Sequence, residues 1–412
     1  QEILDDEFNG RISDAFILKE NEDGDAIYKI SFGGDARFKT RDFQSTFVGF
    51  EEGGFTGTLL PSSIDNLSEI FTQQNINNGL LNVNIQPDDT YEGELLSYAA
   101  FADFIGVFGD FTAEVGLRYQ NDEIDVNFDV GNYVNPVTGA SRIGSSVLSY
   151  DNLYPAVNLK YSFNDKTALR LAGSYTQTLP EFKEIAPFQY VSPIGQVTRG
   201  NPLLERSTSL NIDLKFELFP TSEELLSLTA FYKKIKDPIN KTLVLGGEDL
   251  FSYFNTSDEA RVFGLELEGK VYIIPKKENL ANLKVSGNVS YINHEQDLRS
   301  NGLNVNGSPR SFQYRGIDKI GLEGASDWTT NIGLTLNTGS EFPYEFTVAA
   351  NYASDRIFSL GAPRNQQIVN GDYQGDYFYN GEIIEKGVIG LDFIFSKDIN
   401  KNLSIGLNAK NL

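Results

Sequence analysis

The clearest pattern in the chain is a strict alternation of apolar and polar residues. In residues 210–218, leucine, isoleucine and phenylalanine occupy the even positions, and Asn211, Asp213, Lys215 and Glu217 occupy the odd ones. Successive side chains of a β-strand point to opposite faces of its sheet, whereas a helix would scatter these residues around its circumference. The segment therefore predicts a strand with one apolar face and one polar face.

The same alternation recurs along the chain, so the strand is a repeated unit. Further segments with this pattern are 28–38, 157–163, 263–273, 283–291 and 346–350. In the segment 263–273 the polar positions include Glu266, Glu268 and Lys270. These segments predict an all-β fold.

The connections between the predicted strands alternate between short and long. The short ones are rich in Asn, Asp, Gly and Pro, which supply turn conformations; they are residues 21–25, 107–110, 164–166, 220–223, 275–280, 337–341 and 398–401. The long ones are residues 51–89, 131–150, 179–205, 240–257, 296–326 and 355–372. About 14 antiparallel strands in hairpins, with short periplasmic turns and long extracellular loops, are typical of a transmembrane β-barrel. A soluble β-sandwich lacks this difference between its two ends.

The width of such a barrel decides which face meets which solvent. At about 14 strands the interior is too wide for side chains to fill, so the apolar face must look outward at lipid. The polar face then lines a wet lumen. The predicted lumen-facing residues are Asp213, Lys215, Glu217, Glu266, Glu268 and Lys270.

Composition agrees with this prediction and excludes other classes. The mean hydropathy is −0.29, and no apolar run reaches the roughly 18 residues that a transmembrane helix needs. Barrel strands alternate, so their mean hydropathy is unremarkable. The 20 Tyr and 30 Phe suit strands and aromatic belts at the membrane interfaces.

The charge and the reactive residues exclude nucleic-acid binding and most catalysis. A net charge of −23 lacks the basic surface that a nucleic-acid backbone requires. There is no cysteine and only one histidine, His294, so the sequence predicts no metal site, no cofactor and no catalytic residues. We expect a protein that is not an enzyme.

Several motifs together resemble the barrel of TonB-dependent receptors. The resemblance is densest over residues 151–240 and extends over the whole chain. The segments that carry it are NLYPAVNLKY (152–161), LRL (169–171), SYT (174–176), TLPEF (178–182), APF (186–188), GNP (200–202) with Leu204, residues 227–232 with Lys234 and Pro238, and NAKNL (408–412).

The resemblance implies a receptor of the bacterial outer membrane that imports a scarce nutrient. Iron chelates, cobalamin, oligosaccharides and peptides are the cargo of such receptors. The implied partners are outer-membrane lipid and lipopolysaccharide, a periplasmic TonB-type energy coupler that acts through a plug domain, and in some cases a surface lipoprotein. Plugged transporters have about 22 strands. Residues 1–412 are therefore expected to be part of one transmembrane barrel domain, without the plug and the final strands.

Two other functions remain open from the sequence. One is a passive, porin-like channel complete at about 14 strands. The other is a surface adhesin or assembly protein that uses its loops only to bind partners. An outer-membrane hydrolase is remote, because the chain offers no second histidine to pair with a serine or aspartate.

The long loops supply the candidate binding residues, because loops on a rigid barrel are natural binding surfaces. In the loop 179–205 the candidates are Glu181, Tyr190, Arg199 and Asn201. A second set consists of Arg356, Arg364 and Tyr373, since arginine with aromatic rings suits a sugar or a chelate. The tyrosines and the single tryptophan, Trp328, fit an interfacial belt equally well.

Overall fold

The computed structural model describes residues 1–53, 66–135, 138–244, 250–277, 280–313, 317–361, 367–369, 372–374 and 381–412. Fourteen long strands follow one another in a single antiparallel path, and the short strand β19 (Lys319–Ile320) pairs with β16 beside it. The path is β1 (Glu2–Glu20), β2 (Ala26–Ser45), β5 (Asp89–Phe108), β6 (Phe111–Val134), β7 (Ser141–Asn164), β8 (Thr167–Thr178), β11 (Ser207–Leu218), β12 (Leu225–Lys236), β15 (Ser257–Ile274), β16 (Asn282–Leu298), β20 (Trp328–Asn337), β21 (Tyr344–Ala353), β26 (Ile389–Asn400) and β27 (Leu403–Ala409).

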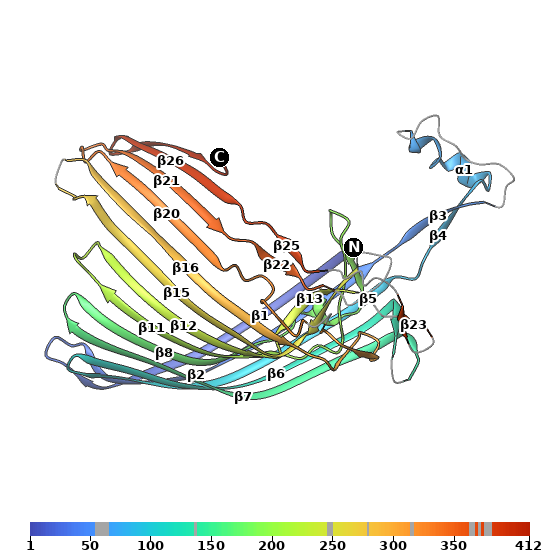
Figure 1. Cartoon of the computed structure of the whole chain (residues 1–412), viewed down its shortest axis with the longest axis horizontal. Helices are drawn as coiled ribbons and strands as arrows, with labels where there is room; N and C mark the ends of the chain where they lie inside the picture. The colour runs from blue at the N-terminus through green and yellow to red at the C-terminus, as the bar shows by residue number, and fades with distance from the viewer. Residues whose placement is uncertain are drawn as a thin grey trace.

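The path forms a large curved sheet whose strands run side by side (Figure 1). The predicted all-β fold of about 14 antiparallel strands is confirmed. Within the described residues β1 and β27 each pair on one side only, so the sheet is curved but not closed.

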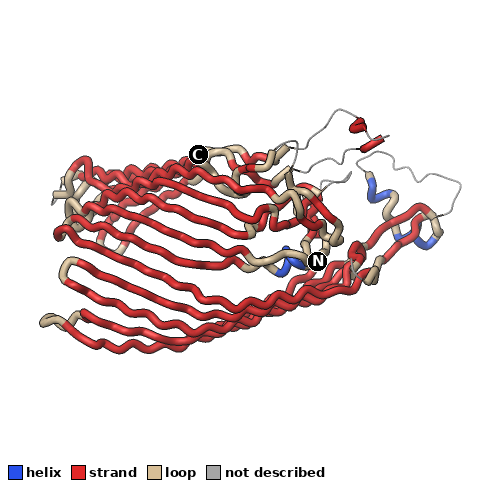
Figure 2. Tube along the Cα trace, turned by 60° about the horizontal axis from the view of Figure 1, so that its bottom comes forward, coloured by secondary structure: helices blue, strands red, loops and turns tan. Residues whose placement is uncertain are grey.

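The two ends of the sheet differ as predicted. Short turns join the strands at one end, and most of the connections at the other end are long and carry elements of their own (Figure 2). These elements are β3 (Val48–Glu52), η1 (Leu67–Glu69), α1 (Gln73–Asn77), β4 (Leu81–Ile85), α2 (Phe182–Ile185), β9 (Gln189–Val191), β10 (Val197–Arg199), β13 (Ile239–Leu243), β14 (Leu250–Asn255), β17 (Gly302–Leu303), β18 (Pro309–Arg310), β22 (Arg356–Ser359), β23 (Gln367–Val369), β24 (Asp372–Gln374) and β25 (Ile383–Glu385).

One predicted loop is wrong. The sequence pattern predicts a long loop over residues 131–150. Instead β6 runs to Val134, β7 begins at Ser141, and the two pair continuously from Phe111↔Tyr161 to Asp129↔Ile143. Backbone pairing between two neighbouring strands outweighs the weak strand preference of these residues.

The faces of β11 have the predicted orientation. Leu210, Ile212, Leu214 and Phe216 are each 40–44% exposed on the outer face, whereas Glu217 on the inner face is 7% exposed. A row of exposed apolar side chains on regular strands is costly in water and favourable in lipid. No helix within the described ranges is long and apolar enough to cross a membrane.

Strand β6 changes the polarity of both its faces partway along its length. Toward the short-turn end, its outer positions are apolar and include Leu117 and Tyr119. Toward the long-loop end, the outer positions become polar, as at Glu123, and the inner positions Ile124 and Val126 become buried and apolar. We interpret the change as the level at which the strand leaves lipid and enters water. The acidic residues Asp122, Glu123 and Asp125 lie in this portion of the strand.

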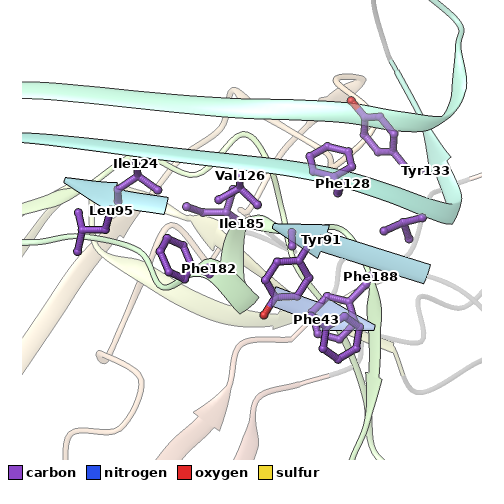
Figure 3. Close-up of a cluster of buried hydrophobic side chains, with 12 residues drawn as sticks. Phe43, Tyr91, Leu95, Ile124, Val126, Phe128, Tyr133, Phe182, Ile185 and Phe188 are labelled. Atoms are coloured by element: carbon purple, nitrogen blue, oxygen red, sulfur yellow. The ribbon is translucent and has the colours of Figure 1, made fainter. Parts of the chain in front are cut away.

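The inner apolar positions of this outer portion form a core with the long connection after β8. The buried side chains come from β2, β5 and β6 on one side and from α2 and Phe188 on the other (Figure 3). The Phe43 ring stacks on the Tyr91 ring, with centroids 5.0 Å apart, and packs at a tilt against the Phe188 ring, at 4.3 Å. The first part of the connection therefore folds inward against the sheet.

Candidate binding site

The inner face of the sheet carries charged side chains that pair across strands. Lys215 Nζ on β11 lies 3.2 Å from Glu268 Oε2 on β15, and Arg170 Nε on β8 donates to Glu217 Oε2 at 2.7 Å. Ser290 on β16 donates a hydrogen bond to Glu266 at 3.1 Å. Such pairing stabilises charged side chains on a partly enclosed face.

The strand register places all six predicted lumen residues on this one face. Glu217 is opposite Ser227, which is opposite Glu268, and alternate positions on each strand share that face. Asp213 and Lys215 therefore lie on the same side of the sheet as Glu266 and Lys270. Their role in lining a lumen remains a prediction.

Four of the long connections pack together at the extracellular end. Strands β13, β14, β10 and β9 form one small sheet, drawn from the connections after β8 and β12. A second apolar core contains Phe254, Leu298, Phe312 and Leu360. This core joins the connections after β16 and β21 to the small sheet. The connections thus form one layer.

The candidates in residues 179–205 have different surroundings. Glu181 is the N-cap of α2 and forms a reciprocal capping box with Glu184. Asn201 is buried; its Nδ2 donates to the Tyr253 carbonyl at 2.9 Å, and its Oδ1 accepts from the Leu203 N–H at 3.0 Å. Glu181 and Asn201 therefore hold the connection in shape. Tyr190 is exposed on β9.

The second candidate set is only partly described. Arg356 is exposed at the start of β22, and its Nε lies 2.8 Å from Glu385 Oε2. Arg364 lies outside the described residues. Of Tyr373 the structure describes the backbone alone, in β24 opposite Ile368.

Arg199 differs from the other candidates because it lines a cavity. The cavity has a volume of about 720 Å³ and lies between the end of β6 and the long connections. Its walls include Tyr133, Phe254, Asn304 and a second arginine, Arg310. A volume of this size is typical of a small-molecule site.

Both arginines of the cavity are poorly solvated. Burial lowers the pKa of Arg310 to about 10 and also lowers the pKa of Arg199. The Arg310 guanidinium lies 4.6 Å from the ring centre of Phe254 and 5.2 Å from that of Phe312. It donates to the side-chain oxygen of Asn304 and to the carbonyl oxygen of Leu243, both at 3.2 Å.

Sequence reasoning found Arg199 and missed Arg310 and Tyr133. Arg310 stands in the predicted loop 296–326, between Pro309 and Ser311, where nothing local separates it from any other loop arginine. Tyr133 was assigned to a loop that proved to be strand. Only the packing of the connections brings residues so distant in sequence to one cavity.

The fold and the distribution of polar side chains define an outer-membrane β-barrel protein. The profile of the TonB dependent receptor-like β-barrel family matches residues 6–412, and the chain belongs to this family. Barrels of this family lie in the outer membrane of Gram-negative bacteria, which gives the location of this protein.

Solved structures share the fold at low sequence identity. The ferric yersiniabactin uptake receptor FyuA from Yersinia pestis has a TM-score of 0.58 at 12% identity, over 100% of this chain and 49% of FyuA. The copper transporter OprC has a TM-score of 0.60 at 11% identity, over 98% of this chain and 50% of OprC. The siderophore receptor PiuA from Acinetobacter baumannii has a TM-score of 0.59 at 11% identity, over 98% of this chain and 52% of PiuA.

The chain thus spans about half the length of these solved structures. No curated protein matches it significantly in sequence.

Proposed function

We propose that this protein imports a scarce nutrient across the outer membrane, with energy coupled through TonB. The cargo is an iron chelate, cobalamin, an oligosaccharide or a peptide. Membership of the receptor family supports this function, and so does the layer of long connections at the extracellular end. The TonB contact and the uptake are activities of the whole receptor.

The observation that carries the proposal is the cavity among the inward-packed connections. A passive pore needs an open water path, and its function does not require loops that form a cavity of small-molecule size. A receptor needs a site that captures cargo before it passes along the polar inner face. The cavity, close to the connections that pack on the inner face of β2, β5 and β6, suits the second role.

The test is uptake in the native bacterium. Wild-type, receptor-null and TonB-null strains are grown with ferric chelates, cobalamin, oligosaccharides or peptides as the limiting nutrient. We expect one nutrient whose uptake falls at least tenfold in both null strains. Uptake that is lost without the receptor but unchanged without TonB would establish a passive channel. Unchanged uptake of every nutrient in the receptor-null strain would favour a surface adhesin.

A further inference from the structure

The cavity is cationic in a strongly acidic protein. Among the described residues its lining includes two arginines, Arg199 and Arg310, and no aspartate or glutamate. The chain as a whole has 57 acidic residues against 34 basic ones and a net charge of −23. A described lining with two arginines and no carboxylate, in such a chain, has the electrostatics of an anion site.

Neither arginine has a carboxylate partner among the described residues. Other arginines on the sheet are paired, as Arg118 is with Asp35 at 2.6 Å. Arg310 is 9% exposed, and its hydrogen bonds go to neutral oxygens of Asn304 and Leu243. A guanidinium has five N–H donors, so several of its donors remain available for a ligand.

Arg199 is still less satisfied. Its Nε is buried and has no hydrogen-bond partner in the described part of the chain. A buried, unpartnered charged donor costs several kcal/mol, and the cost is offset when an opposite charge arrives. Two cations without a carboxylate partner among the described residues therefore line one cavity, which indicates a site that is completed by its ligand.

We propose that this cavity binds an organic anion whose carboxylate or phosphate oxygens are held by Arg199 and Arg310. The rings of Tyr133 and Phe254 provide apolar walls for its carbon skeleton, and the side chains of Asn132 and Asn304 offer further polar contacts. The planar guanidinium matches both kinds of oxyanion with two parallel hydrogen bonds. The inference rests on the proposed function, because it takes this anion to be the imported cargo or a part of that cargo.

Binding is measured by titration calorimetry on the protein purified from the outer membrane, with citrate as the carboxylate probe and pyrophosphate as the phosphate probe. We expect at least one of the two to bind, and the stronger one identifies the oxyanion. Arg199→Gln and Arg310→Gln should each weaken binding at least tenfold. Arg261→Gln, at an exposed arginine of β15 paired with Glu259, is the matched control and should bind as the wild type does.

Arg199→Gln is the variant less prone to disturb folding, because the Arg199 Nε makes no hydrogen bond within the described residues that the substitution would break. Arg310→Lys keeps the charge but not the planar fork, and intermediate binding is expected from it. Absence of binding by both probes, or equal binding by Arg199→Gln and the control, would overturn the proposal. Probe binding without nutrient uptake in cells would instead overturn the proposed function and leave the anion site standing.

Discussion

Neighbouring residues of one strand in this protein face opposite surroundings. Leu214 and Asp213 are adjacent in β11, but Leu214 is exposed on the outer face whereas Asp213 shares the inner face with Lys215. Hydrogen bonds to β8 and β12 hold β11 in register on both sides, so it cannot slip to exchange the two faces. The effect of a substitution therefore depends on its face more than on its chemistry.

A charge at Leu214 should prevent membrane assembly. An arginine on the lipid face near the middle of the membrane costs about 2–4 kcal/mol. We expect Leu214→Arg to be depleted from the outer-membrane fraction and to lose the heat-modifiable band on electrophoresis. Asp213→Asn is the matched control and should assemble normally. Equal tolerance of both substitutions would contradict the assignment of faces.

A buried carboxyl in the layer of connections should make that layer sensitive to pH. Burial raises the pKa of Glu323 from 4.5 to about 7, and the backbone N–H of Lys241 donates to its carboxyl. In the folded layer the group holds its proton to higher pH than in an opened one. The protonated Glu323 carboxyl therefore leaves the folded layer at its full stability below pH 4.5. That stability is lost as the pH rises through about 7 and the buried carboxyl ionises.

The expected effect is a loosening of this layer as the pH rises, by an order of 2–3 kcal/mol from pH 5 to pH 8. Hydrogen exchange of residues 239–243, corrected for the intrinsic pH dependence, measures it. Glu323→Gln keeps an acceptor for the Lys241 N–H without the titration, and its protection should hardly change with pH. The same loss of protection in both proteins would refute the role of Glu323.

At the scale of elements, short segments decide how the long connections are anchored. Helix α2 has only four residues and owes its position to Phe182 and Ile185, which are buried against β5 and β6. Gly93 on β5 makes room for this contact, because a Cβ there would lie 2.8 Å from the Phe182 ring. A small residue in the strand thus allows the connection to pack inward.

Removing the Phe182 ring should release this connection. Truncation of a buried phenylalanine to alanine costs about 3–5 kcal/mol. In Phe182→Ala, residues 179–205 should become cleavable by protease added to intact cells, while the sheet remains assembled. Lys183→Ala, at an exposed neighbour, is the control and should stay resistant. Resistance of Phe182→Ala as well would mean that other contacts anchor the connection.

The sequence predicts the strands well and the connections poorly, for physical reasons. The alternation in residues 210–218 arises because one face of the strand is apolar and the other is polar. Strand β11 and its orientation therefore follow from the pattern. Residues 131–150 lack a clear signal because their strand pairing depends on a partner segment. The cavity arginines come from connections more than a hundred residues apart, and no local pattern records that they meet.

At the scale of the whole molecule, the change of polarity along β6 defines a membrane level. Leu117 and Glu123 share the outer face, six residues apart, which is about 20 Å along a strand. Because the chain has no cysteine, single cysteines can report on each position without background.

Glu123→Cys should react with a membrane-impermeant maleimide on intact cells, and Leu117→Cys should not. A lipid-soluble maleimide should label Leu117→Cys, which shows that the thiol is present and free. Ile124→Cys is buried on the inner face and should resist the impermeant reagent. Labelling of Leu117→Cys from outside would place the membrane level closer to the short turns.

The order of the strands has a consequence for biogenesis. Each strand between β1 and β27 in the main path pairs with the strand that precedes it and the strand that follows it in that path, with no crossover. Pairing partners that are close along the chain close small loops and fold quickly. The sheet can therefore grow one hairpin at a time as the polypeptide is delivered to the membrane. The unpaired backbone groups at the edge of each added hairpin are the template on which the next hairpin pairs.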